Sequence, residues 1–267
     1  IWLWDDWPGY WGPDNGIDLV AETQEGQLWA IQAKCYDPES QVPTSEIDSF
    51  ISASSRPEFD HRLLISTGQL SKNAEYKLTH QGKSTAFLLY QGLTESPVDW
   101  LAYLDGSRTA LPDKKTPRPH QQKAIDDVID GFSDNDRGRL IMACGTGKTL
   151  TALWMAEKLE SKRTLVLLPS LLLLSKTLAD WVTHANEPFA YLPVCSDETV
   201  TRGADVVMSS TSDLAFPSTT DAGEIADFLR KDGRRVIFST YQSSPKLAEA
   251  FKQGKVPGFD LVIADEA

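Results

Sequence analysis

The chain has 267 residues, of which 41% are hydrophobic and 24% charged, and its formal net charge is −12. This composition is typical of a globular protein with enough apolar residues for one large or two ordinary domains. No apolar run approaches the roughly 20 residues that a membrane span needs, so the sequence predicts no membrane-spanning helix in this chain. The longest apolar run, Thr164 to Leu174, is too short and is interrupted by Pro169.

The charge is distributed unevenly along the chain. Residues up to Asp105 include 6 Lys/Arg and 16 Asp/Glu, which leaves 20 and 22 for the rest. Phosphate binding favours a basic surface, but with this distribution the total charge neither predicts nor excludes a DNA partner. Three cysteines without a CxxC spacing argue against a disulfide framework and a zinc site, and they favour a cytoplasmic protein. The chain starts without Met and stops inside an apolar strand pattern, so we expect it to be a piece of a longer protein.

Alternating strands and helices are predicted for the first part of the chain. The strands are short runs rich in apolar residues, and the first two are joined by a turn around TQEGQ. In chain order we expect strands at Ile17 to Glu22 and Leu28 to Lys34, a helix at Thr44 to Ala53, a strand at Arg62 to Ser66, a helix at Ser71 to Thr79 and a strand at Ala86 to Tyr90.

A linker is predicted next, because Asp105 to His120 is rich in Pro, Gly, Lys and Asp and lacks periodicity. We therefore expect one domain over residues 1–105, a linker over 106–119 and a second domain over 120–267. The second domain is expected to contain helices at Gln121 to Gly131, Thr149 to Leu159 and Ser175 to Thr183, and strands at Gly138 to Ala143, Arg163 to Leu168, Ala204 to Ser209, Arg235 to Thr240 and Asp260 to Asp265. The stretch MSSTSDLAFPSTTDAGE is interpreted as a loop. This alternation predicts an α/β fold with a parallel sheet in the second domain.

Three polar residues stand out on the first two strands: Asp18, then Gln32 and Lys34 two positions apart. Side chains alternate along a strand, so Gln32 and Lys34 share one face. The other face, with Ile31, Ala33 and Cys35, is expected to enter the core. The polar set is then either a charged surface or a site, and a following helix with Glu46 and Asp48 favours a site.

A metal-dependent phosphodiesterase needs this kind of residue set. The Asp18 carboxylate would hold Mg²⁺, helped by the side-chain oxygen of Gln32 and the backbone carbonyl of Ala33. Lys34 would position or help deprotonate the attacking water and stabilise the developing charge. Asp14 is an alternative to Asp18, but it precedes the strand.

The strongest motif is LIMACGTGKTL, in which a predicted strand runs into Gly145, Thr146, Gly147, Lys148 and Thr149 and a helix begins at once. Glycines let backbone N–H groups surround a polyphosphate at a helix N-terminus. Lys148 would reach the β- and γ-phosphates of ATP, and the Thr149 hydroxyl would bind Mg²⁺. Met142 stands where the usual pattern has its first glycine.

A second strand end, FDLVIADEA, supplies the carboxylates that such a loop needs. Asp265 would help to hold Mg²⁺, and Glu266 would orient or deprotonate the attacking water.

With these motifs the chain from His120 to Ala267 resembles superfamily 2 helicases and translocases. The segment MACGTGKT is similar to their motif I and ADEA to motif II, which implies an N-terminal RecA-like motor domain. The segment RPHQQKAID resembles their adenine-reading Gln segment, with Gln121 the better match and Gln122 the alternative. The resemblance places Ser170 and Thr240 near a DNA strand, although helix capping explains both residues equally well. The second motor domain would lie beyond Ala267, so the chain by itself is expected to hydrolyse ATP poorly.

The segment DNGIDLVAETQEGQLWAIQAKCY resembles the Mrr-like branch of PD-(D/E)xK nucleases, in which Gln commonly replaces the acid. The resemblance runs from about Trp4 to Tyr90 and implies a catalytic trio of Asp18, Gln32 and Lys34. It also implies a mixed-sheet domain. The adjacent aromatic cluster WLWDDWPGYW could stack on bases, but its acids Asp5 and Asp6 favour core packing instead.

A nuclease followed by a motor resembles single-chain restriction enzymes, and the segments PSLLLLSKTLADW, VCSDETV and STYQS most resemble those of the Type ISP class. The resemblance implies ATP-driven translocation on double-stranded DNA coupled to Mg²⁺-dependent cleavage, with a methyltransferase and a target-recognition region beyond Ala267. Two alternatives remain open. One is a repair or phage-defence helicase–nuclease without a methyltransferase, and the other is a motor whose nuclease-like module only docks on DNA.

Overall fold

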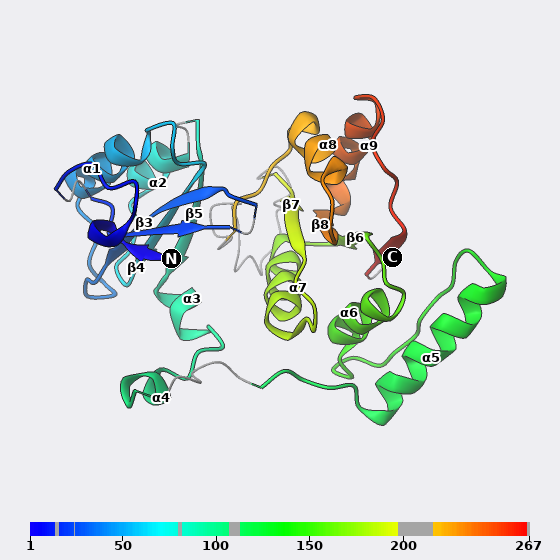
Figure 1. The fold of residues 1–267 in the computed structure, drawn as a ribbon. Helices are drawn as coiled ribbons and strands as arrows, with labels where there is room; N and C mark the ends of the chain where they lie inside the picture. The colour runs from blue at the N-terminus through cyan, green and yellow to red at the C-terminus, as the bar shows by residue number, and fades with distance from the viewer. Residues whose placement is uncertain (14–15, 24, 80–81, 107–112, 197–215, 266–267) are drawn as a thin grey trace. The chain divides into compact units, whose positions relative to one another are not determined.

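The computed structural model describes residues 1–13, 16–23, 25–79, 82–106, 113–196 and 216–265 (Figure 1). These residues fall into two compact units. The chain up to Ser96 makes most of the first unit, and the chain from Pro97 onward makes most of the second. Among the described residues, no helix is both long enough and apolar enough to span a bilayer.

The first unit is built on a mixed five-stranded sheet in the order β1-β2-β3-β4-β5. The strands are Trp2–Leu3, Leu19–Glu22, Leu28–Lys34, His61–Ser66 and Ser84–Leu89. The pairs β1·β2 and β2·β3 are antiparallel, whereas β3·β4 and β4·β5 are parallel. Parallel neighbours need a crossover, which α1 (Thr44–Ser54) and α2 (Lys72–Thr79) supply. The mixed sheet expected for this domain is confirmed.

The core of the first unit lies between its sheet and α1. Its buried side chains include Val20 and Ala30 from the sheet and Ile47 and Phe50 from α1. Trp4, in the short 3-10 helix η1 (Trp4–Asp6), is 3% exposed, and other aromatic side chains of the N-terminal cluster pack against this core. The prediction that the aromatic cluster packs is therefore confirmed.

The prediction that Ile31, Ala33 and Cys35 enter the core is confirmed for Ile31 and wrong for the other two residues. Ala30 and Gln32 are fully buried on the face that packs toward α1, whereas Ala33 and Cys35 are exposed. The period-two pattern separated the two faces of the strand correctly, but the helix covers the face that carries the amide. A polar side chain therefore enters the core, where its hydrogen bonds have to be made locally.

The second unit has a four-stranded parallel sheet in the order β7-β8-β6-β9. The strands are Ala190–Val194 (β7), Arg235–Thr240 (β8), Arg163–Leu168 (β6) and Leu261–Ala264 (β9). The longer helices are α5 (Pro119–Asp134), α6 (Lys148–Lys158), α7 (Leu171–His184), α8 (Ala222–Arg230) and α9 (Ser244–Phe251) (Figure 1). The parallel sheet predicted for this domain is confirmed.

The strand expected at Gly138 to Ala143 is wrong, because these residues form no regular element. Ile141 is 85% exposed, and it lines, together with Leu140 and Met142, a hollow that these residues share with β9. The alternation typical of a strand is present, but a strand also needs hydrogen bonds to a neighbour. Among the described strands, β9 pairs with β6 alone.

Several other helices and strands were not predicted from the sequence. The edge strand β7 contains Pro193, and proline within a run argues against a central strand but is tolerated at an edge. Helix α8 starts inside the stretch interpreted as a loop. Asp221 is its N-cap, and the Asp221 side chain accepts a hydrogen bond from the Glu224 amide. The short helices α3 (Tyr90–Thr94) and α4 (Trp100–Leu104) precede the predicted linker. The strand predicted at 204–209 lies outside the described residues.

Candidate active sites

Asp18 is held at the start of β2 by both of its neighbours in the sheet. Its backbone amide donates to the Ile31 carbonyl at 2.9 Å, and its carbonyl accepts from the Trp4 amide at 3.0 Å. The carboxylate Oδ2 accepts from the Ala33 amide at 2.7 Å. The N–H and C=O of one strand residue point to the same side, so the Ala33 carbonyl faces the strand that carries Asp18.

Gln32 lies on β3 between Ile31 and Ala33, the two residues whose backbone groups bind Asp18. Its side chain is 1% exposed, and its Oε1 has no hydrogen-bond partner among the described residues. Gly16 makes room for it, because a Cβ there would stand 3.1 Å from Gln32 Nε2 and 3.1 Å from the Phe50 amide. With φ at +97°, position 16 also favours glycine by conformation.

Lys34 points toward α1 and meets Glu46. Its Nζ is 3.1 Å from Glu46 Oε2, and the Tyr36 hydroxyl donates to Glu46 Oε1 at 2.5 Å. The hydrogen bond from Tyr36, followed by the contact with Lys34, lowers the pKa of Glu46 from its ordinary value of 4.5. The same bond to Glu46 raises the pKa of Tyr36 above 10.0. The carboxylate is therefore ionised near neutral pH and fixes the Lys34 ammonium.

A hollow of about 820 Å³ opens beside these residues in the first unit. Gln32, Lys34 and Glu46 line it, whereas Asp18 is not among the described residues that do so. Within the described part of the chain, no group of three His, Cys, Asp or Glu could hold a metal. The donors that could hold Mg²⁺ are instead a carboxylate, an amide oxygen and a carbonyl, all of them the hard oxygen ligands that this ion prefers. The buried, unpartnered Oε1 of Gln32 fits this donor set.

The phosphate loop of the second unit depends on glycines in the left-handed region, with φ at +74° for Gly145 and +85° for Gly147. Gly147 is the N-cap of α6, which begins at Lys148. The loop therefore presents backbone N–H groups at a helix N-terminus, the arrangement that suits a polyphosphate. Thr146 closes the turn, with its Oγ1 donating to the Ala143 carbonyl at 2.7 Å.

Gln121 is buried against this loop. Its Nε2 donates to the Thr146 carbonyl at 3.0 Å, and its Oε1 accepts from the Arg118 amide at 2.8 Å. Gln122, the alternative, is exposed and donates to Asp126. The structure thus places the preferred glutamine where it supports the phosphate loop from α5.

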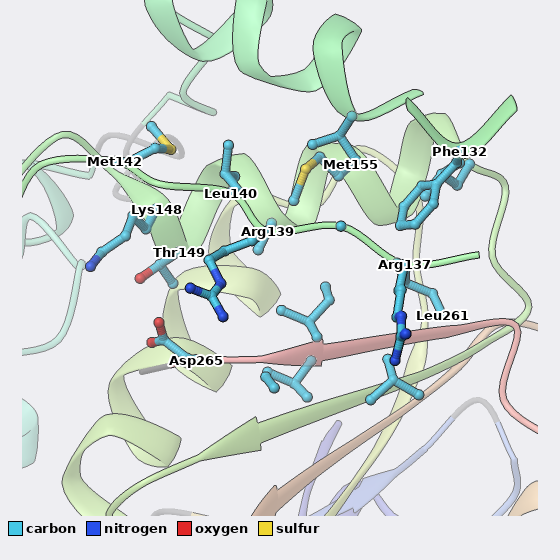
Figure 2. A pocket seen from close by; sticks show the side chains of 18 of the residues that line it. Phe132, Arg137, Arg139, Leu140, Met142, Lys148, Thr149, Met155, Leu261 and Asp265 are labelled. Carbon is cyan, nitrogen blue, oxygen red and sulfur yellow. The ribbon is translucent and has the colours of Figure 1, made fainter. Parts of the chain in front are cut away.

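Asp265 follows β9 and faces the start of α6. Figure 2 shows its carboxylate and the Thr149 hydroxyl pointing toward one another, with Lys148 close by. All three line a hollow of about 900 Å³. The carbonyl of Asp265 accepts from the Tyr241 hydroxyl at 2.8 Å, which ties the end of β9 to the end of β8. Glu266 and Asp14 lie outside the described residues.

The two residues with alternative explanations differ in the structure. Ser170 is the N-cap of α7, with its side chain accepting from the Leu173 amide at 3.3 Å. Thr240 is fully buried and donates to Ser243 Oγ at 3.1 Å. Helix capping accounts for Ser170, and burial with a local hydrogen bond accounts for Thr240.

Sequence reasoning missed several residues at these sites. The sequence patterns indicate no role for Tyr36, Tyr241 or Arg139. They indicate Glu46 only as an acid on the helix that follows. Arg139 lines the hollow beside Lys148 and Thr149, and its guanidinium reaches toward Asp265 in Figure 2. Of these residues, only Glu46 could have been found from its position in the sequence, because it lies in the first turn of the helix that follows β3.

Comparisons with known proteins match the two parts of the chain separately. Residues 1–110 match the family model described as "Restriction endonuclease", and residues 114–267 match the one described as "Type III restriction enzyme, res subunit". The structure of the ATP-dependent Type ISP restriction-modification enzyme LlaBIII bound to DNA matches with a TM-score of 0.85 and 33% identity, covering 99% of this chain and 18% of that one.

A curated relative also matches. It is named "Probable helicase", comes from African swine fever virus, and is 30% identical over 162 residues, which is 61% of this chain and 16% of the relative. The chain therefore spans less than a fifth of the length of either protein.

Proposed function

We infer, since the chain belongs to the family described as Type III restriction enzyme, res subunit, that it is part of an ATP-dependent restriction endonuclease. It combines a restriction nuclease domain with a helicase domain and resembles a Type ISP restriction-modification enzyme in structure. We propose that Mg²⁺-dependent cleavage by the first domain is coupled to ATP-driven translocation on double-stranded DNA by the second.

The observation that carries the nuclease proposal is the buried Oε1 of Gln32, which has no partner among the described residues. Gln32 directly precedes Ala33, whose amide donates to the Asp18 carboxylate. Asp18, the Gln32 amide oxygen and the Ala33 carbonyl would hold Mg²⁺. When bound, this ion supplies Lewis-acid stabilisation of the phosphoryl oxygens. Lys34, fixed by Glu46, would orient the attacking water or take its proton and stabilise negative charge on the phosphate.

In the second domain, the amides of residues 145–149 would bind the phosphates of ATP, and Lys148 would contact the β- and γ-phosphates. Thr149 and Asp265 would hold the Mg²⁺ that accompanies ATP, and Glu266 would activate water. Gln121 supports the loop from α5. We propose that it also contacts the adenine of ATP. The facing of Thr149 and Asp265 in Figure 2 supports this assignment.

The remaining proposals concern boundaries and partners. We propose a nuclease domain over residues 1–105, a linker over 106–119 and a RecA-like motor domain over 120–267. The partners are double-stranded DNA and further domains of the same polypeptide: a second motor domain, a methyltransferase and a target-recognition region. The DNA-bound state of LlaBIII supports the first of these partners. Reduced, separate cysteines favour a cytoplasmic location.

The test uses the intact protein with DNA, ATP and Mg²⁺. Asp18→Ala should abolish strand cleavage and leave ATP hydrolysis intact, because the two sites lie in different domains. Lys148→Ala should abolish ATP hydrolysis and, with it, cleavage that requires translocation. If Asp18→Ala cuts as the wild type does, the first domain is a docking module. If Lys148→Ala does so, cleavage is independent of the motor.

A further inference from the structure

Cations are scarce in the first unit, which makes their placement informative. Its residues up to Ser96 include 6 Lys/Arg against 14 Asp/Glu. A polyanion can approach such a unit only where a cation offsets this charge. Of the six cations, Lys34 and Arg56 alone are among the described residues that line the hollow beside Gln32.

Three of the other cations already serve the fold. Lys77 pairs with Asp48 at 2.8 Å, Lys83 donates to the Phe59 carbonyl at 2.6 Å, and Arg62 is fully buried. Lys72, the sixth, is exposed on α2. The hollow therefore receives its positive charge from Lys34 and Arg56.

The acids that line the hollow are themselves paired. Both carboxylate oxygens of Asp48 accept from Lys77, at 2.8 and 3.0 Å. Glu46 accepts from Tyr36 and contacts Lys34. With these carboxylates engaged, Arg56 is the cation of the hollow with the weakest ion pair. Its contact with Glu58 is 3.8 Å long, and both side chains are about half exposed, so that pair contributes little.

Arg56 is nevertheless held in place. Its guanidinium carbon lies 4.2 Å from the centroid of the Trp11 ring, and Trp11 also lines the hollow. A flat guanidinium on an aromatic face keeps its N–H donors at the edge, where they can bind a phosphate with two hydrogen bonds.

The backbone around Arg56 is anchored by two other cations, Arg62 and Lys83. Arg62 donates from Nε to Ser54 Oγ at 2.7 Å and from Nη2 to Ser55 Oγ at 2.9 Å, and Lys83 donates to the carbonyl of Arg56 itself. These contacts fix the C-terminal end of α1, where positive charge is also favourable. Arg56 is thus positioned before any ligand arrives.

We propose that Arg56 binds a backbone phosphate of the DNA strand at the nuclease site, beside the phosphate that is cut. The hollow of about 820 Å³ has the volume of a site for a ligand larger than one phosphate group. Gln32, whose buried Oε1 has no partner among the described residues, also lines this hollow. This inference rests on the proposed nuclease function, because it assumes that the strand is cut beside Gln32 and Lys34.

The experiment measures strand cleavage by the intact protein, with ATP and Mg²⁺, over a range of salt concentrations. For Arg56→Ala we expect the cleavage rate to fall about tenfold, the effect of one charge-assisted contact. We also expect the slope of log rate against log salt to weaken by about 0.9, the value for one neutralised phosphate. Arg56→Lys keeps the charge but loses the flat stacking, so its rate should be intermediate.

Lys72→Ala is the matched control, because it removes one charge from an exposed position of the same unit outside the hollow. It should leave both rate and slope unchanged. A wild-type rate and slope for Arg56→Ala, with Asp18→Ala inactive, overturn the phosphate contact and leave the nuclease site standing. A lower melting temperature with an unchanged slope also overturns it, since Arg56 would then only clamp Trp11. Full cleavage by Asp18→Ala overturns the nuclease proposal itself.

Discussion

In the first unit the pairing of β2 with β3 brings Asp18 to the backbone of Ile31 and Ala33, the neighbours of Gln32, whereas in the second unit Gly145 to Thr149 are consecutive residues of a single loop. The first site is deep, with a fully buried amide against α1. The second is open, with Gly145 exposed in the loop before α6. A site made by pairing depends on the packing of the whole unit, whereas a site made by a loop depends on local backbone conformation.

The largest effect is expected from a substitution in the loop of the second unit. In Gly147→Ala the new Cβ would collide with Gln121 Nε2, and the φ of +85° is strained for alanine. We expect ATP affinity, measured by titration with a fluorescent nucleotide, to fall roughly a hundredfold, or about 2.7 kcal/mol. Gly233→Ala has a similar φ and open space around it, so it should leave ATP affinity unchanged. Equal affinities for Gly147→Ala and wild type would contradict the role of the loop.

The next effect tests the deep site. Gln32→Glu places a carboxylate in a fully buried position, and without a counter-ion we expect a loss of roughly 2 kcal/mol in the free energy of unfolding. Mg²⁺ should restore most of this stability, so the melting temperature should rise more with Mg²⁺ than in the wild type. Gln32→Met, which has a similar size and no oxygen, should not respond. An equal response of all three proteins would rule out a metal at this position.

A smaller effect is expected from the residue that fixes Lys34. Glu46→Gln keeps an acceptor for Tyr36 but removes the charge that faces the Lys34 ammonium. We expect the cleavage rate to fall about fivefold, near 1 kcal/mol, because Lys34 is then less firmly placed. ATP hydrolysis in the same reactions serves as the internal control. A cleavage rate above that of the wild type would show that Glu46 restrains Lys34 instead of positioning it.

Tyr241→Phe tests a contact of the second unit that depends on tertiary packing. The Tyr241 hydroxyl joins the end of β8 to the end of β9, two segments that a loop motif does not connect. The hydroxyl supports the Asp265 carbonyl, and its loss removes one hydrogen bond of about 1 kcal/mol. Steady-state ATP hydrolysis with DNA present should fall about threefold, with little change in ATP affinity. A fall in affinity alone would place Tyr241 in nucleotide binding.

The smallest effect concerns pH and the core of the second unit. Burial, and then the charge of Lys115, lower the pKa of His184 below its ordinary 6.5. The unfolded chain therefore takes up this proton at a higher pH than the folded one, so the stabilisation is complete above pH 6.5 and is lost as the pH falls toward the folded pKa. His184→Gln should lose less stability than the wild type between neutral and mildly acidic pH, by roughly 1 kcal/mol or less. Parallel unfolding curves at the two pH values would contradict this.

Several elements could be predicted from local pattern alone. The bounds of β3, β6 and β8 agree with the predicted strands, and α1 extends one residue beyond its predicted end. These segments combine a clear period with turn residues at their ends. The glycine turn that leads into α6 could also be predicted, because its glycines, lysine and threonine are adjacent and need only a helix to follow. The segment at 138–143 failed because alternation cannot show whether a neighbouring strand will pair with it.

The sequence by itself determined the two domains' fold classes and the residue types that carry their proposed chemistry, since hydrophobic period and short motifs act over a few neighbouring residues. Only the tertiary structure decided which face of β3 is buried, that Glu46 holds Lys34, and that Arg56 rests on Trp11. These contacts join residues from separate elements, and a helix can cover either face of a strand. Packing makes that choice through the burial of the whole unit, which no single segment encodes.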